Sequence, residues 1–303
     1  MTPRTKVVLT DRDREILDLL ARSQWLSTQQ LRRRFFAHAS PNAVQKRLRR
    51  LVRSGVLHGA QPSRTEQRYV RLTHLGLTEA GRPDRSLAVR LPAQLRHFTS
   101  INDVRLWFEL QESLEVTGFW AEWEYRPFGT KDAIVPDAIV SCGTLPAQRF
   151  AIEVDQASEN ASVVARKVEA YQKGSGDELA GVLLYVPGSK RLRSVVAACC
   201  RAAGICAGLR TWLIDLDSLW RLDSNVLRCI SLDALAGGAS PVNQSLAMIL
   251  NPSPASVSPR EERRHSLNPQ ATDTSPDKMS PKYRGTLDAN VRMDDNPVDG
   301  SIQ

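Results

Sequence analysis

The stretch IVPDAIVSCGTLPAQRFAIEVDQASENASVVARKVEAYQ, at residues 134–172, decides the fold that this chain is expected to adopt. Two apolar runs in it predict two adjacent strands, the first ending at Asp137 and the second spanning residues 150–155. Glu153 and Asp155 are two residues apart, so both side chains project from one face of the second strand. The sequence therefore predicts three carboxylates at one edge of a sheet.

Three carboxylates at a sheet edge make a ligand set for a hard cation. Their oxygens select Mg²⁺ or Mn²⁺, and such a cation can orient a water and offset the charge that develops on a scissile phosphate. We therefore predict Asp137, Glu153 and Asp155 as metal ligands and as catalytic residues. The alternative interpretation of the Glu153 and Asp155 pair is ordinary polar residues at a strand end.

A predicted helix follows the second strand and carries Lys167 and Tyr171 four residues apart, on one helical face. Lys167 joins the predicted catalytic residues as an electrostatic stabiliser, and Tyr171 is a second-line candidate. The alternatives are a solvated helix residue for Lys167 and core packing for Tyr171. Glu159 lies just before this helix, where its negative charge can favour the positive N-terminal end of the helix.

The order of these residues resembles the PD-(D/E)xK nuclease fold and, over roughly residues 10–190, the replication-relaxation family of plasmid and mobile-element proteins. The narrower resemblance also includes His97, Asn102-Asp103, Trp123-Glu124 and Glu159. It implies second-line site roles for His97, Asp103 and Glu124. A lone histidine in the long helix predicted over residues 95–115 can equally be a packing residue. Nucleases of this fold usually have a lysine where this chain has Asp155, which leaves Lys167 to supply the positive charge from the helix.

The N-terminal part of the chain is strongly basic. Residues 1–90 hold nineteen Lys or Arg against seven Asp or Glu, a balance of +12, whereas the whole chain is +8. The remaining residues are therefore net −4. A basic segment joined to a slightly acidic one predicts contact with a phosphate backbone.

Capping residues and apolar stripes predict three helices in this basic segment. Thr10 begins the first helix, Ser27 begins the second, and Ser40, ahead of a proline, begins the third, which ends at Gly55. The following residues predict a strand, a Pro-containing turn, a strand and a short helix. The whole segment resembles a winged helix-turn-helix.

The third helix has one apolar side and one basic side, as a helix that enters the major groove requires. Asn42 and Gln45 could address adenine and Arg49 guanine, although the register is open. A solvated helix face is the alternative, and a winged helix can also bind protein or RNA. Arginines of the second helix fit phosphate contacts better than base contacts. The predicted DNA-binding residues are Arg32, Arg33, Arg34, Asn42, Gln45, Lys46, Arg49, Arg50, Arg53, Arg64 and Arg68.

The chain is expected to be α/β in its main part and α+β overall. We predict a winged helix-turn-helix domain over residues 8–90, a restriction-endonuclease-like α/β domain with a central mixed sheet over residues 91–236, and a disordered tail over residues 237–303. Residues 251–303 hold seven of the seventeen prolines and no Phe or Trp. Such a segment cannot bury enough apolar area to offset its chain entropy.

Several classes of protein are excluded by the sequence. The cysteines lack the paired spacing of a zinc site and their number is odd, so we interpret them as reduced core residues. No apolar segment has the length of a bilayer span, which predicts a cytoplasmic protein without a membrane partner. No phosphate-binding glycine loop is present, so no nucleotide cofactor is expected. The five cysteines are Cys142, Cys199, Cys200, Cys206 and Cys229.

Three functions remain open, all with double-stranded DNA as the expected partner and Mg²⁺ or Mn²⁺ as the expected cofactor. The first is a DNA-binding protein of plasmid or mobile-element replication, relaxation or mobilisation, as the resemblance implies. The second is an active Mg²⁺-dependent endonuclease or nickase. The third is a transcriptional regulator whose nuclease-like domain has lost catalysis and serves for homodimerisation or partner binding.

Overall fold

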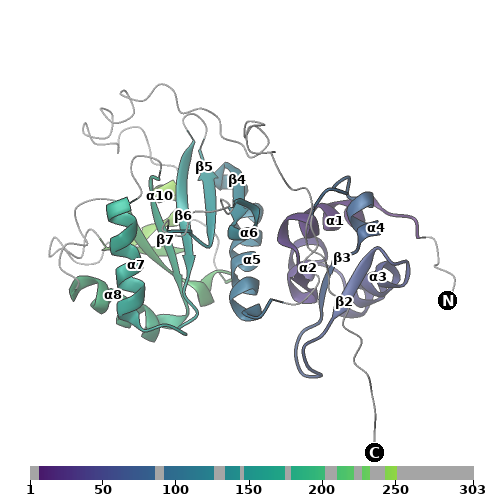
Figure 1. Cartoon of the computed structure of the whole chain (residues 1–303), viewed down its shortest axis with the longest axis horizontal. Coiled ribbons are helices and arrows are strands. Elements are labelled where there is room, and N and C mark those ends of the chain that lie inside the picture. The colour runs from purple at the N-terminus through teal and green to yellow at the C-terminus, as the bar shows by residue number, and fades with distance from the viewer. Residues whose placement is uncertain are drawn as a thin grey trace, which may run out of the picture. The chain divides into compact units, whose positions relative to one another are not determined.

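Helices and strands are interspersed along the chain, and the strands form two sheets, as expected for a protein of mixed α and β structure (Figure 1). All the residues that can be described fall within one compact unit, which spans residues 1–256. The computed structural model describes residues 7–85, 92–125, 134–143, 147–174, 179–201, 210–221, 227–232 and 243–250. The predicted boundary between the two domains, at residues 90 and 91, lies outside these ranges.

The N-terminal region begins with the three predicted helices, α1 (Asp11–Ser23), α2 (Thr28–Phe35) and α3 (Pro41–Arg53). Each helix starts at the predicted cap, because the side-chain oxygens of Thr10, Ser27 and Ser40 each accept a hydrogen bond from the backbone N–H three residues further on. These N–H groups would otherwise lack an intrahelical partner. Gly55, at φ 79°, redirects the chain after α3.

A small antiparallel sheet completes the N-terminal region. It contains β1 (Leu26–Ser27), β2 (Leu57–Ala60) and β3 (Tyr69–Leu72) in the order β1-β3-β2, and α4 (His74–Glu79) follows β3. Apart from β1, which was not predicted, the elements occur in the order that the sequence predicts. Ile16, Leu48, Leu51 and Val70 belong to one buried core that joins the helices to this sheet.

The α/β region is built on a mixed sheet of seven described strands in the order β10-β9-β8-β7-β6-β5-β4. Only the pairs β6 with β7 and β7 with β8 are parallel, and all the other pairs are antiparallel. The strands are β4 (Val116–Ala121), β5 (Ala138–Cys142), β6 (Gln148–Val154), β7 (Gly181–Val186), β8 (Arg210–Asp215), β9 (Arg228–Ser231) and β10 (Asn243–Ser245).

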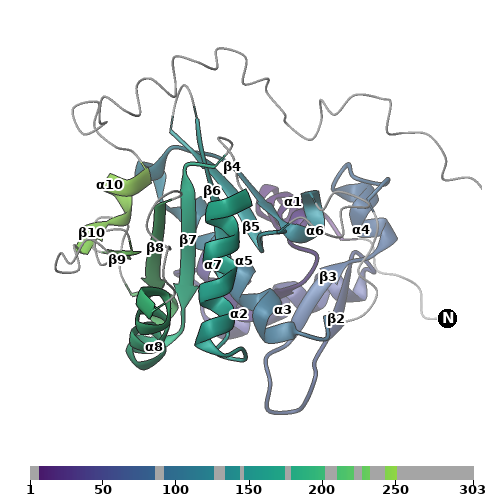
Figure 2. The ribbon, with the colours of Figure 1, turned by 60° about the vertical axis from the view of Figure 1, so that its left-hand side comes forward.

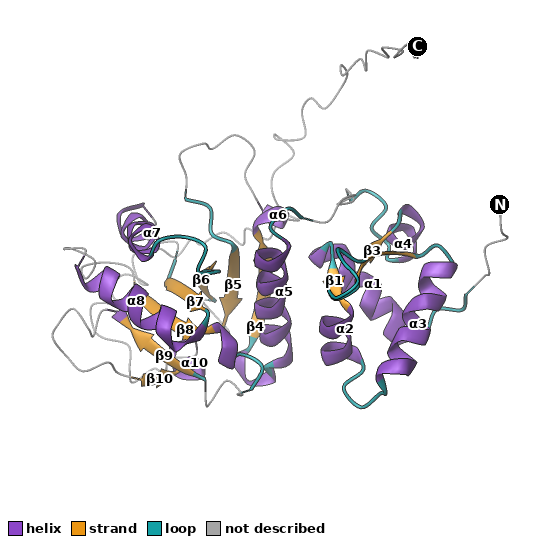
Figure 3. Ribbon diagram, turned by 90° about the horizontal axis from the view of Figure 1, so that it is seen from below, coloured by secondary structure: helices purple, strands orange, loops and turns teal. Residues whose placement is uncertain are grey.

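Helices cover both faces of this sheet. Helices α7 (Ala161–Gly174) and α8 (Gly188–Arg201) share one buried core and lie on the same face, in front of the sheet in Figure 2. Successive side chains of β7 point to opposite faces of the sheet. Leu184 packs with α7 and α8 on one face, while Leu183 packs with α5 (Leu95–Leu110) on the other. Figure 3 shows α5 along β4 and β5.

Helix α5 is shared by the cores of both regions. Leu106 packs in the N-terminal core, whereas Val104 and Trp107 pack in the core of the α/β region. The side-chain amide of Asn102 also donates a hydrogen bond to the backbone carbonyl of Trp25 at 3.1 Å. The helix ends at Leu110, before the predicted residue 115, and a 3₁₀ turn (Glu112–Leu114) follows it.

The C-terminal boundary predicted for the folded part is wrong. Strand β10 and helix α10 (Leu246–Leu250) lie within the predicted tail, yet β10 pairs with β9, and Leu246 and Ile249 are buried in the main core. The average composition of a long segment hides a short apolar run, so the tail was placed too early. Residues 237–242 and 251–303 lie outside the described ranges.

The cysteines follow the sequence interpretation in part. Cys142, Cys199 and Cys229 are buried, whereas Cys200 is exposed on α8, which contradicts a core role for it. Cys206 lies outside the described residues. Among the described residues, no helix has the combined length and apolar character that crossing a membrane requires.

Candidate functional site

Asp137 and Glu153 lie at one edge of the main sheet, although not for the predicted reason. Asp137 directly precedes β5 and does not end a strand. Strands β5 and β6 are antiparallel, with Ala138 opposite Ile152, so the start of one meets the end of the other. The Oδ2 atom of Asp137 accepts a hydrogen bond from the backbone N–H of Val154 at 2.7 Å, which holds the carboxylate at this edge.

Glu153 is the central residue of this edge and is only 8% exposed. The hydroxyl of Tyr171 donates a hydrogen bond to its Oε1 atom at 2.5 Å, and the Nζ atom of Lys167 lies 3.9 Å from its Oε2 atom. Burial raises the pKa of the Glu153 carboxyl, and the charge of Asp137 raises it further, against the weaker effects of Tyr171 and Lys167. The buried carboxyl of Glu153 therefore holds its proton more readily than an exposed glutamate does.

His97 completes this group from the N-terminal end of α5. Its Nε2 atom lies 2.9 Å from Oδ1 of Asp137. Burial alone would lower the pKa of His97, but the hydrogen bond and the charge of Asp137 outweigh burial and raise it. We call Asp137, Glu153, His97, Lys167 and Tyr171 the acid cluster; the structure brings these five predicted residues together.

Asp155 does not join the acid cluster, which corrects the prediction of a three-carboxylate site. It forms a two-point ion pair with Arg191 of α8, with Nε to Oδ2 at 2.6 Å and Nη2 to Oδ1 at 3.2 Å. The Nη2 atom of Arg191 also donates to the carbonyl of Glu159 at 2.8 Å. The sequence did not indicate Arg191, because nothing local ties it to a residue 36 positions away.

The described residues contain no group of three His, Cys, Asp or Glu side chains arranged to hold a metal ion. Asp137 and Glu153 remain as a pair. Two carboxylates fit Mg²⁺ chemically, because this ion is usually bound by one or two carboxylates and keeps several waters. The negative charge of Asp137 beside Glu153 fits a place for a cation.

Two second-line candidates have other positions. Asp103 accepts a hydrogen bond from Nε2 of Gln30 at 3.1 Å and lies 3.7 Å from Nη1 of Arg33, so it faces α2. Burial raises the pKa of Asp103 to about 6. Glu124 pairs with the fully buried Arg105. The contacts of both carboxylates are with other elements of the fold.

The three arginines of α2 differ in their surroundings. Arg32 is exposed, as a phosphate contact requires. Arg33 lies over the ring of Trp220, 4.6 Å from its centroid, and faces Asp103, so it is engaged within the protein. Arg34 is half-buried, with its guanidinium 5.3 Å from the ring centroid of Phe35.

Helix α3 has the predicted two-sided character. Val44, Leu48 and Leu51 are buried. Arg47, in the middle of the basic run, pairs with the buried Asp13 of α1 and is not exposed. The exposed residues of α3 include all of its predicted DNA contacts, which are Asn42, Gln45, Lys46, Arg49, Arg50 and Arg53.

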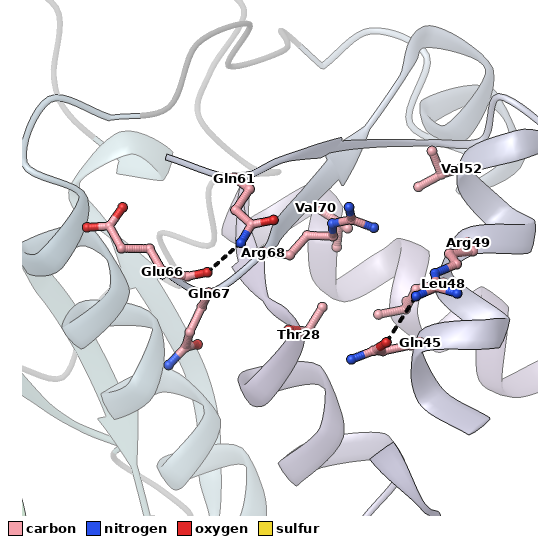
Figure 4. A pocket seen from close by; sticks show the side chains of 10 residues that line it. All are labelled: Thr28, Gln45, Leu48, Arg49, Val52, Gln61, Glu66, Gln67, Arg68 and Val70. Atoms are coloured by element: carbon pink, nitrogen blue, oxygen red, sulfur yellow. Dashed lines mark hydrogen bonds between the residues drawn. The ribbon is translucent and has the colours of Figure 1, made fainter. Parts of the chain in front are cut away.

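A groove of about 360 Å³ lies between α3 and the β2–β3 hairpin (Figure 4). We call it the α3–hairpin groove. Gln45, Leu48, Arg49 and Val52 line it from α3, and residues of the hairpin, including Arg68, line the other side. Arg64 and Arg68 are both exposed.

The fold and these sites define a two-part protein, with a basic helix-and-hairpin region and a mixed-sheet α/β region that carries an acid cluster at one sheet edge. Residues 17–179 match the replication-relaxation family, and the chain belongs to this family. Membership suggests a role in the replication or relaxation of plasmids or mobile elements. Neither curated proteins nor solved structures give a significant match.

Proposed function

We propose that the chain is a DNA-binding protein of plasmid or mobile-element replication, relaxation or mobilisation, and that its N-terminal region is a winged helix-turn-helix for double-stranded DNA. The observation that carries the proposal is the exposed polar side of α3, where Lys46, Arg49, Arg50 and Arg53 all reach solvent. The opposite side of the helix is packed in the core, so this surface is presented on a fixed element.

Charge and shape favour duplex DNA as the partner. A basic helix of this size fits the major groove, and a hairpin beside it can reach the neighbouring backbone. Binding through lysines and arginines releases counterions, so the affinity should fall steeply with salt. Arg32, which is exposed on α2, would add a phosphate contact, whereas Arg33 is held by Trp220 and Asp103.

The test compares two double variants of the full chain by fluorescence anisotropy with a labelled duplex. Lys46→Ala with Arg49→Ala removes two charges from the exposed side of α3. Lys190→Ala with Arg193→Ala is the matched control, because it removes the same residue types at the same spacing from the exposed side of α8. We expect the first variant to bind at least about tenfold more weakly and with a shallower salt slope. Equal affinities for the two variants would exclude α3 as the contact surface.

A second candidate function, DNA cleavage, is favoured by the convergence of Asp137, Glu153 and Lys167. Asp137 and Glu153 would hold Mg²⁺ or Mn²⁺, which would supply a polarised water and offset charge on the phosphate. Lys167, which is half-exposed, can approach a phosphate beside Glu153. His97 holds Asp137 in place through its hydrogen bond.

Supercoiled plasmid incubated with either metal tests the second candidate. Glu153→Gln keeps the acceptor for the Tyr171 hydroxyl and removes the charge, so it should abolish nicking. Glu112→Gln makes the same change at an exposed position and should leave nicking unchanged. Absence of nicking with both metals, while duplex binding persists, would favour the regulator without catalysis.

A further inference from the structure

Two arginines from different elements face the α3–hairpin groove. Arg49 projects from α3, and Arg68, just before β3, points from the hairpin toward that helix (Figure 4). The Nη2 atom of Arg49 donates a hydrogen bond to Oε1 of Gln45 at 3.2 Å, a neutral acceptor. Within the described part of the chain, neither guanidinium has a carboxylate partner within 4.0 Å.

The groove also lacks an acid that faces inward. Glu66 is the one acidic residue among those that line it, and its side chain points away from α3 in Figure 4. Leu48, Val52 and Val70 add apolar side chains to the lining. Two guanidinium groups and apolar side chains in one groove match an anion flanked by carbon-rich surface, which is the chemistry of a sugar-phosphate chain.

Arg49 differs from the other exposed basic residues of α3 because it lines the groove. The α3 residues that line the groove are at positions 45, 48, 49 and 52, whereas Lys46, Arg50 and Arg53 do not line it. Arg49 is three residues from Lys46 and four from Arg53, so it lies where the groove meets the outer basic surface of α3. The two surfaces can therefore contact different parts of one duplex.

We propose that the α3–hairpin groove holds the backbone of one DNA strand and that Arg49 and Arg68 bind the same phosphate. The proposal rests on the DNA-binding function proposed above and assigns Arg49 to the phosphate, not to guanine as the sequence suggested. Base contacts then fall to the outer side of α3, where Asn42 and Lys46 are exposed.

A double-mutant cycle tests the shared phosphate. Affinities of the full chain, Arg49→Ala, Arg68→Ala and the double variant are measured on two duplexes of unrelated sequence. Each single variant should lose the same factor on both duplexes, because a phosphate carries no sequence information. The double variant should lose less than the product of the single losses, by at least about threefold, since both side chains serve one partner.

Arg64 supplies the comparison, because it is exposed on the same hairpin but does not line the groove. The affinity loss of the Arg49→Ala, Arg64→Ala double variant should equal the product of the two single losses within about twofold. The shared phosphate would be overturned, with DNA binding left intact, by either of two results. One is that the affinity losses of Arg49→Ala and Arg68→Ala also multiply, and the other is that a loss is confined to one duplex. If the unaltered chain shows no salt-dependent binding to either duplex, both proposals fail together.

Discussion

The Nε atom of Arg191 on α8 donates a hydrogen bond to Oδ2 of Asp155 at 2.6 Å, and this pair removes Asp155 from the acid cluster. The same guanidinium reaches the carbonyl of Glu159, and Asp155 also accepts a hydrogen bond from the backbone N–H of Ala157 at 2.8 Å. These contacts fix the loop that leads into α7. The helix that carries Lys167 and Tyr171 is thereby held beside Glu153.

Arg191→Ala should destabilise the protein strongly. The side chain of Asp155 is only 2% exposed, so the variant leaves a buried carboxylate without its cation. Breaking such a pair typically costs roughly 3–5 kcal/mol of the free energy of unfolding, which urea denaturation measures. Arg193→Ala, at an exposed position of the same helix, should stay within about 0.5 kcal/mol of the unaltered chain. Similar values for both variants would show that the ion pair does not stabilise the fold.

Substitutions of Arg47 and Arg49 on α3 should affect different properties, the first the stability of the fold and the second the binding of duplex DNA. Arg47 donates from Nε to Oδ1 of Asp13 at 2.8 Å, whereas Arg49 is exposed. Burial would raise the pKa of Asp13, but hydrogen bonds from Arg47 and Thr10 outweigh burial and lower it. Arg47→Ala should therefore reduce the free energy of unfolding at neutral pH by roughly 2–4 kcal/mol. Arg49→Ala should change it by less than about 0.5 kcal/mol and weaken duplex binding instead.

Combined urea denaturation and anisotropy titration of these two variants measures both effects. The carboxylate of Asp13 is charged at neutral pH, and its contribution is lost when the pH falls through its lowered pKa, so the cost of Arg47→Ala should shrink in acid. A stability loss for Arg49→Ala as large as that for Arg47→Ala would contradict the structural assignment.

Asp103 should give the stability a recognisable pH dependence. Burial raises the pKa of Asp103 from 3.8 to about 6, so the folded chain retains a proton that the unfolded chain has released. The free energy of unfolding should accordingly fall as the pH rises through this window. Asp103→Asn keeps an acceptor for Gln30 and removes the titration. The unaltered chain should lose on the order of 2 kcal/mol more than this variant between about pH 4 and about pH 7. Parallel curves for the two proteins would contradict this account of Asp103.

The C-terminal end of the folded part can be tested by shortening the chain. Residues 1–242 lack β10 and α10, and with them the buried Leu246, Ile249 and Leu250. Burying one such side chain contributes about 1.5–3 kcal/mol, so this chain should lose several kcal/mol or fail to fold. Residues 1–250 should retain the unfolding transition of the full chain, which circular dichroism follows. Equal transitions for both shortened chains would refute a structural role for residues 243–250.

The features of this structure that depend on residues close in sequence could be predicted. The caps at Thr10, Ser27 and Ser40 and the alternation around Glu153 depend on residues close in sequence, and each was confirmed. The face of the helix that carries Lys167 was likewise set by its four-residue spacing to Tyr171, and both side chains reach Glu153.

Long-range contacts were the part that local patterns could not give. The pairing of Asp155 with Arg191 depends on the crossover that brings α8 beside the end of β6, and no nearby residue signals it. The sequence predicted the same phosphate-contact role for Arg33 as for its neighbour Arg32, but Trp220 and Asp103 contact Arg33 in the fold. Identical residue types in one helix therefore took different roles because of contacts far away in sequence.

Photo-crosslinking tests the central claim, that DNA lies on α3, most directly. A photoreactive residue is placed at Asn42, exposed on α3, or at Ser194, exposed on α8, and each full-length protein is irradiated with a bound duplex. We predict crosslinked DNA from position 42 and only background from position 194. Equal crosslinking from position 194, or none from position 42 while the duplex remains bound, would contradict the account.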